Sequence, residues 1–344
     1  MMVTVANVAQ RAGVSPATAA RVLSGRGYAS DDARRAVLDA AKEIGYVPNH
    51  IARSLRTRRT MLAGLLIGDV ENSFYSVIAK NVERVAKEAG YHVVLCNSND
   101  DAETESQYLK LLDGIRVDGL IITPTGRNQR HLRRLLEKGT AIIQIDRMVD
   151  GLNADAVLLD NEAGAMAAVS HLIAAGHTRI GILTGPRDVL TARERLEGYE
   201  RSLREHGIPV RPELIRTGSF LHDHALEAAT ELLTSRPAPT AIFAANNVLA
   251  EGCFLALGGL GLRVPRDVSM VAFDDVPWMS MVRPQLATVR QPVADMARSA
   301  AELMLRRLRD TGPGPVPSTS VFRSELVVRG SVAPTRKTRG EPSS

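Results

Sequence analysis

The chain has 344 residues, of which 44% are hydrophobic, so it is too long for one ordinary domain and suits two or three packed cores. We find no run of 18 apolar residues and no signal-peptide core, and therefore expect neither a membrane span nor export. The two cysteines, Cys96 and Cys253, form no CxxC pair, which argues against a disulfide or zinc framework and favours a reducing cytoplasm.

The net charge of +5 is unevenly distributed along the chain. Residues 1–60 contain ten Lys and Arg side chains and four carboxylates. Residues 61–344 contain 33 Lys and Arg side chains and 34 carboxylates. A basic segment on a near-neutral remainder indicates a polyanionic partner. The segment also has helical patterning, so we do not interpret it as a solvated tail.

Three short helices are predicted near the N-terminus. Thr4 is suited to cap the first helix, and Gly13 to end it in a left-handed conformation. Ser15 is suited to cap the second helix, with Pro16 at its first position, and Ser30 to cap the third. Three short helices with a tight glycine-containing turn between the first two predict an all-α helix-turn-helix headpiece.

The run VTVANVAQRAGVSPATAARVLSG, followed by GYVPNHIARSLRTRRT, closely resembles the headpiece and hinge of the lactose-repressor (LacI/GalR) family. The chain departs from the usual family pattern at Ala19-Ala20, where Val-Ser is common, and at Ser24, where Asn is common. The resemblance implies a DNA-binding headpiece over residues 1–47 and a hinge helix with linker over residues 48–60.

By this resemblance the second helix enters the major groove of operator DNA. Pro16, Ala17 and Arg21 then face base edges, and Arg21 can donate two parallel hydrogen bonds to guanine. Ser15 and Thr18 would bind phosphates and fix the register of the helix on the duplex. The alternative for Arg21 is a surface arginine that only faces solvent.

The hinge segment is too short to form a stable isolated helix in water. In the family it folds against DNA and against its twin from a second subunit, which implies a homodimer on a pseudo-palindromic operator. Ala52 and Leu55 share one face, and the resemblance makes Leu55 the apolar wedge that enters the minor groove between base pairs. The alternative, packing of Leu55 on the body, is disfavoured by the arginines around it.

Residues 61–330 alternate short apolar runs with amphipathic stretches, which predicts parallel sheets covered on both faces in two similar α/β lobes. VDGLI, DNEAGAMAAVSHLIAAGHTRIGIL and VPRDVSMVAFDD resemble the periplasmic-binding-protein-like (type I) effector domain of the same family. The resemblance implies that the chain crosses between the lobes near residues 160, 287 and 320. The polar tail over residues 331–344 is expected to be disordered.

Ligands of such folds bind in the crevice at the carboxyl ends of the strands. Candidate effector-binding residues are the polar groups at these ends and the nearby aromatic side chains: Asp146, Asn246, Asp274, Arg195, Phe74, Tyr75, Phe220 and Trp278. Carboxylates, an amide and a guanidinium can bind a ring of hydroxyls, so a sugar or related polyol is favoured, with a nucleoside or purine second. Phe74 and Trp278 could instead be core residues, and Asn247 stands where the family commonly has Asp.

Enzyme function is not indicated, because the sequence has no GxSxG, HExxH or GxxxxGK[ST] motif. His222 and His224 beside Asp223 are interpreted as a solvated helix start, so neither a metal nor a cofactor is expected. A transport-type sugar-binding protein and an enzyme on an α/β scaffold are the rival interpretations, and the basic headpiece argues against both. We expect a cytoplasmic, nucleoid-associated transcriptional repressor; induction and co-repression stay open.

Replacement of Leu55 by Ala tests the predicted wedge. We expect weaker operator binding and a smaller DNA bend, because unstacking of the base pairs loses its compensating contact, while effector binding is unchanged. Gel shifts on operator fragments with the site at different positions report both quantities. Affinity and bending equal to those of the wild type would give Leu55 a different role.

Overall fold

The computed structural model describes residues 3–23, 28–46, 59–220, 222–310 and 316–335. The chain divides into two compact units, Met1–Thr60 and Met61–Ser344, which are considered separately below. The hinge candidates Ala52 and Leu55 lie outside the described residues.

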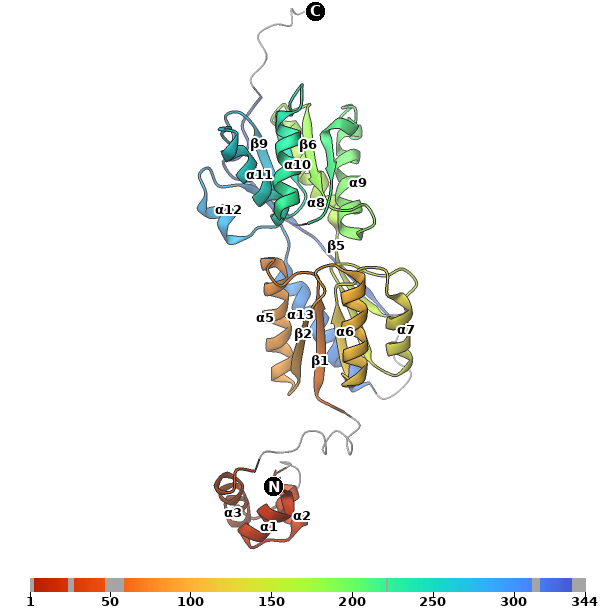
Figure 1. Cartoon of the computed structure of the whole chain (residues 1–344), viewed down its shortest axis with the longest axis vertical. Coiled ribbons are helices and arrows are strands. Elements are labelled where there is room, and N and C mark those ends of the chain that lie inside the picture. The colour runs from red at the N-terminus through yellow and green to blue at the C-terminus, as the bar shows by residue number, and fades with distance from the viewer. Residues whose placement is uncertain (1–2, 24–27, 47–58, 221, 311–315, 336–344) are drawn as a thin grey trace, which may run out of the picture. The chain divides into compact units, whose positions relative to one another are not determined.

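The first unit contains three helices, α1 (Val5–Ala12), α2 (Pro16–Leu23) and α3 (Asp31–Glu43), drawn in red in Figure 1. Thr4 caps α1 as expected: its hydroxyl accepts from the N–H of Asn7, whose side chain accepts from the N–H of Thr4. Gly13 ends the helix at φ +67°. The helices enclose a small core of Val8, Ala9, Ala19, Val22, Val37, Ala40 and Ala41.

The second unit contains two six-stranded sheets. The first sheet consists of β1 (Leu62–Ile67), β2 (His92–Asn97), β3 (Gly119–Ile122), β4 (Ala141–Ile145), β5 (Asp155–Leu159) and β11 (Thr319–Phe322). The second consists of β6 (Ile180–Thr184), β7 (Ile215–Thr217), β8 (Ala241–Ala244), β9 (Ser269–Phe273), β10 (Ala287–Arg290) and β12 (Glu325–Val327). Their strand orders are β11-β5-β4-β3-β1-β2 and β12-β10-β9-β8-β6-β7, and the β10–β12 pair alone among these is antiparallel.

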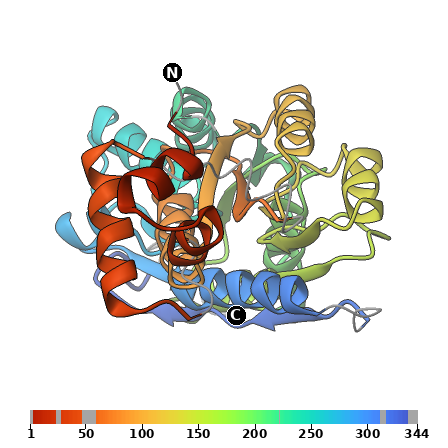
Figure 2. The same cartoon turned by 90° about the horizontal axis from the view of Figure 1, so that it is seen from below.

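Helices cover both faces of each sheet. The first sheet carries α5 (Ser73–Glu88), α6 (Ala102–Gly114), α7 (Gln129–Glu137) and α13 (Val293–Arg309), and is called the N-lobe with them. α5 and α13 lie on one face of this sheet and α6 and α7 on the other (Figure 2). The second sheet carries α8 (Asn161–Ala174), α9 (Leu190–Glu205), a short 3-10 turn (Pro212–Leu214), α10 (His222–Thr234), α11 (Asn247–Gly259) and α12 (Pro277–Met281), and is called the C-lobe.

No helix in the described part of the chain combines the length and hydropathy needed to cross a bilayer.

The chain crosses between the lobes three times. β5 of the N-lobe leads into α8 of the C-lobe, β10 of the C-lobe leads into α13 of the N-lobe, and β11 leads back to β12. These crossings fall within a few residues of the expected positions. The two-lobe α/β fold predicted from the sequence is therefore present.

The C-terminal residues that the structure describes belong to the C-lobe. The buried hydroxyl of Ser331 donates to the carbonyl of Met270 (2.6 Å) and accepts from the N–H of Ala287 (2.7 Å). The expectation of disorder over residues 331–344 is therefore wrong for residues 331–335. A polar composition does not reveal that one hydroxyl completes the hydrogen bonds of two strands. The remainder of the tail lies outside the described residues.

Ser331→Ala tests this attachment. The substitution leaves a buried carbonyl and a buried N–H without their partner, so the free energy of unfolding should fall by about 1–3 kcal/mol. Ser280→Ala, which removes an exposed hydroxyl, is the matched control and should change it by less than about 0.5 kcal/mol. Urea titration measures both, and equal values for the two variants would contradict the structural role of Ser331.

Candidate functional site

The second helix of the first unit presents the predicted DNA-contacting residues on its outer face. Ser15, Pro16, Ala17 and Arg21 are exposed and Thr18 is half-buried, while Ala19 and Val22 face the core. The Ser15 hydroxyl accepts from the N–H of Thr18 (3.1 Å), which caps the helix. This outer face of α2 is exposed in the structure.

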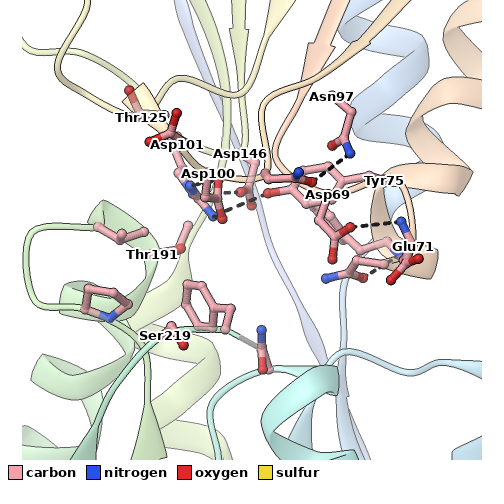
Figure 3. Close-up of a pocket in the computed structure, with 18 of the residues that line it drawn as sticks. Asp69, Glu71, Tyr75, Asn97, Asp100, Asp101, Thr125, Asp146, Thr191 and Ser219 are labelled. Carbon is pink, nitrogen blue, oxygen red and sulfur yellow. Dashed lines mark hydrogen bonds and ion pairs between the residues drawn. The ribbon is translucent and has the colours of Figure 1, made fainter. Parts of the chain in front are cut away.

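A cavity of about 850 Å³ lies in the second unit at the carboxyl ends of the strands of both sheets (Figure 3). Seven carboxylates line it: Asp69, Glu71, Asp100, Asp101, Asp146, Asp188 and Asp274. Three guanidinium groups line it as well, those of Arg127, Arg147 and Arg195. The rest of the wall consists of amides, hydroxyls, aromatic rings and a few aliphatic side chains, namely Asn72, Asn97, Asn99, Asn246, Gln291, Thr125, Thr191, Ser219, Phe74, Tyr75, Phe220, Val70, Ala102, Pro186 and Val189.

Seven of the eight candidate effector-binding residues line this cavity: Phe74, Tyr75, Asp146, Arg195, Phe220, Asn246 and Asp274. Trp278 does not, and its prediction as a cavity wall is wrong. Its ring packs on Phe254 of α11 at a centroid distance of 5.8 Å, because the short helix α12 directs it to the core of the C-lobe.

The most strongly connected side chain in the N-lobe wall, Arg147, is missing from the predicted set. Its guanidinium forms a bidentate ion pair with Asp100 (2.7 and 3.2 Å) and donates to the Tyr75 hydroxyl (3.3 Å). Asp146 lies 3.5 Å from its Nε. The pair Asp146-Arg147 after a buried strand is a signal for this role, but Asp100 comes from a different loop that no local pattern connects to it.

Burial controls the protonation of this cluster. Burial raises the pKa of Tyr75, so its hydroxyl stays protonated and remains a donor. Burial also raises the pKa of Asp146 to about 6, against the lowering effect of Arg147 and Arg195. Asp274 and Asp100 add to the rise. Asp146 therefore titrates near neutral pH.

In the C-lobe wall, the polar candidate side chains are held by hydrogen-bond partners. Arg195 donates to the Asn161 side chain (2.9 Å) and to the carbonyl of Ala245 (2.7 Å), and its guanidinium lies 3.7 Å from the centroid of the Phe273 ring. Asp274 accepts from the N–H of Asn247 (3.0 Å) and from the Gln291 side chain (2.5 Å).

Loops of both walls form the N-caps of the adjoining helices. Asn246 accepts from the N–H of Leu249 at the start of α11, and Asp101 from the N–H of Thr104 at the start of α6. Capping fixes these side chains at strand ends before any ligand arrives. Such fixed donors and acceptors can bind a small polar molecule with little further ordering.

Two contacts bridge the lobes across the cavity. Arg127 of the N-lobe pairs with Asp188 of the C-lobe (2.7 Å), and Asn247 donates to the Asn72 side chain (2.8 Å). The ion pair is exposed, at 72% and 61% for the two side chains, and exposed pairs contribute little free energy. The exposed ion pair therefore adds little to the stability of this arrangement of the lobes.

No group of three His, Cys, Asp or Glu side chains in the described ranges is placed to hold a metal ion. A helix-turn-helix unit joined to a two-lobe body with a polar cavity is the arrangement expected of DNA-binding regulators governed by small molecules.

Comparison with known proteins identifies the family. A family model described as "Bacterial regulatory proteins, lacI family" matches residues 4–49, and one described as "Periplasmic binding proteins and sugar binding domain of LacI family" matches residues 60–320. The ribose operon repressor of Halalkalibacterium halodurans is 35% identical over 94% of this chain and 96% of its own length. The chain belongs to the lacI family.

Solved structures agree with this assignment. The lac repressor dimer bound to operator and the anti-inducer ONPF matches with a TM-score of 0.84 at 26% identity, covering 97% of this chain and 100% of that chain. A lacI-family regulator from Enterococcus faecium with bound ribose has a TM-score of 0.73 at 26% identity, covering 80% of this chain and 100% of its own. This chain is a sequence-specific DNA-binding transcriptional regulator with an effector-binding domain, and not an enzyme.

Asp146→Asn tests the cost of the buried carboxylate. With a folded-state pKa of about 6 and an unfolded value of about 3.9, ionised Asp146 destabilises the fold on the order of 3 kcal/mol. This cost is complete above pH 6, declines between about pH 6 and pH 4, and is absent below.

We therefore expect Asp146→Asn to be more stable than the wild type at pH 8, with a smaller difference at pH 5, by denaturant titration at each pH. Asp150→Asn, at an exposed carboxylate outside the cavity wall, is the control and should show no such trend. A pH-independent difference for Asp146→Asn would contradict the raised pKa.

Proposed function

We propose that this regulator represses transcription and that its effector is a sugar or a related polyol bound in the cavity between the lobes. The observation that carries the proposal is the set of buried, pre-oriented polar groups beside the aromatic rings of Phe74, Tyr75 and Phe220. Hydroxyl rings need fixed donors and acceptors around their edges and flat apolar surfaces against their faces. The ribose-bound neighbour from Enterococcus faecium supports the same class of ligand.

On the DNA side, Pro16, Ala17 and Arg21 contact base edges, and Ser15 and Thr18 contact phosphates. The exposure of this face of α2 supports the assignment. Arg21 provides the two parallel donors that read guanine, and the hydroxyls fix the register. The hinge residues Ala52 and Leu55 are assigned to the minor groove by resemblance alone, and the regulator works in the cytoplasm at the nucleoid.

The working unit is a homodimer on a pseudo-palindromic operator, since one headpiece reads only one half-site. Large apolar side chains exposed on the second unit support a subunit interface there: Val70, Val77, Leu95, Leu255 and Met281. α5, which carries Val77, and α12, which carries Met281, lie on the same side of the unit in Figure 1.

The effector acts through its preference for one arrangement of the lobes. Only one exposed ion pair, Arg127–Asp188, and one hydrogen bond, Asn247–Asn72, are described across the cavity, and a ligand that contacts both lobes can outweigh them. Coupling must be reciprocal, so operator DNA changes effector affinity by the same factor as the effector changes operator affinity. Induction, in which the effector lowers operator affinity, is the direction that we propose.

The experiment is a thermal-shift screen of sugars and polyols, followed by operator titrations with the compound that stabilises the protein. Arg195→Lys keeps the charge but loses the planar fork, so effector affinity should fall about tenfold or more while operator affinity without effector is unchanged. Arg204→Lys, on the exposed side of the same helix, is the matched control and should change neither. If Arg195→Lys and wild type bind the effector equally well, the cavity is not the effector site.

A further inference from the structure

The charges of the cavity constrain the form of the ligand. Seven carboxylates against three guanidinium groups leave an excess of four negative charges among the described lining residues. Two of the carboxylates, those of Asp146 and Asp274, are more than nine-tenths buried, where the dielectric is low and like charges repel strongly. A ligand that carries a negative charge of its own would add to that repulsion.

Each lining guanidinium already has a partner. Arg147 is bidentate with Asp100, Arg127 pairs with Asp188, and Arg195 donates to an amide oxygen and a backbone carbonyl. Phosphate and carboxylate recognition in proteins depends on a guanidinium fork that is available to face the anion. Binding of an anion at Arg147 or Arg127 would require the loss of one of these ion pairs.

A buried acceptor without a partner in the cavity wall indicates a ligand that carries hydroxyl groups. Gln291 lines the cavity, is more than nine-tenths buried, and donates its amide N–H to Asp274. Its side-chain oxygen has no hydrogen-bond partner among the described residues. An unpaired acceptor needs a donor, which a sugar hydroxyl supplies.

We infer that the cavity admits its sugar only in a form without negative charge and excludes the phosphorylated and carboxylated derivatives of the same sugar. The inference rests on the proposed function, namely that the cavity binds a sugar. The inference also places the effector in a reaction sequence. The sugar is supplied by a reaction that releases it without a phosphate group, such as hydrolysis of a glycoside. A sugar kinase then removes it by phosphorylation.

The first arm of the test measures the cavity charge without any sugar. Ser219→Cys places a thiol in the wall, and Thr234→Cys places one at the exposed far end of α10, about 18 Å along the helix from its start. Both native cysteines are buried, so they contribute little background. Each variant reacts with a trimethylammonium and with a sulfonate methanethiosulfonate reagent.

At each position we take the ratio of the reaction rate of the trimethylammonium reagent to that of the sulfonate reagent. At low salt, this ratio at position 219 should exceed the ratio at position 234 about tenfold or more. Added salt should reduce the difference between the two ratios. An equal or smaller ratio at position 219 would overturn the inference. This result does not depend on which ligand the protein takes.

The second arm compares matched pairs by calorimetry: ribose with ribose 5-phosphate, glucose with glucose 6-phosphate, and fructose with fructose 6-phosphate. Wherever the parent sugar binds, its phosphate should bind at least about 100-fold more weakly. A phosphate that binds as tightly as its parent overturns the inference and leaves the proposed function intact. Binding of no member of the panel counts against the proposed function, and the labelling ratio then decides the inference alone.

Discussion

The chain passes three times between two parallel sheets, and the carboxyl ends of the strands of both sheets meet at one cavity. Each lobe keeps its own sheet and covering helices. The crossings at β5–α8, β10–α13 and β11–β12 are short. A ligand in this cavity contacts residues of both lobes, so its binding depends on their relative arrangement.

The cavity wall is costly to maintain. Buried ions lose hydration, and a pair such as Arg147–Asp100 recovers that loss only through good geometry and additional hydrogen bonds. Asp146 has a pKa of about 6, so its ionised form lowers the free energy of unfolding. Apolar side chains of similar size would pack there more favourably, so these groups are best explained by ligand binding rather than by folding.

The sequence predicted features that local chemistry determines. Caps at Thr4, Ser15 and Ser30 depend on residues three positions apart, and Asp146, Asn246 and Asp274 follow buried strands directly. The two-lobe fold and the family followed from motifs with strong specificity. Two expectations were wrong for physical reasons: Trp278 turns toward Phe254, and Ser331 is buried between strands. Arg147 and Gln291 were missed because their partners come from other loops.

The central claim is that effector binding moves the lobes and that this movement releases DNA. Lys87 on α5 and Thr234 on α10 are exposed and lie in different lobes, so a doubly labelled Lys87→Cys, Thr234→Cys protein, diluted with unlabelled protein, reports the distance between the lobes in one protomer. We predict that effector titration shifts the label-to-label distance with the same midpoint at which operator DNA is released. Release of DNA with no change in that distance would contradict the account.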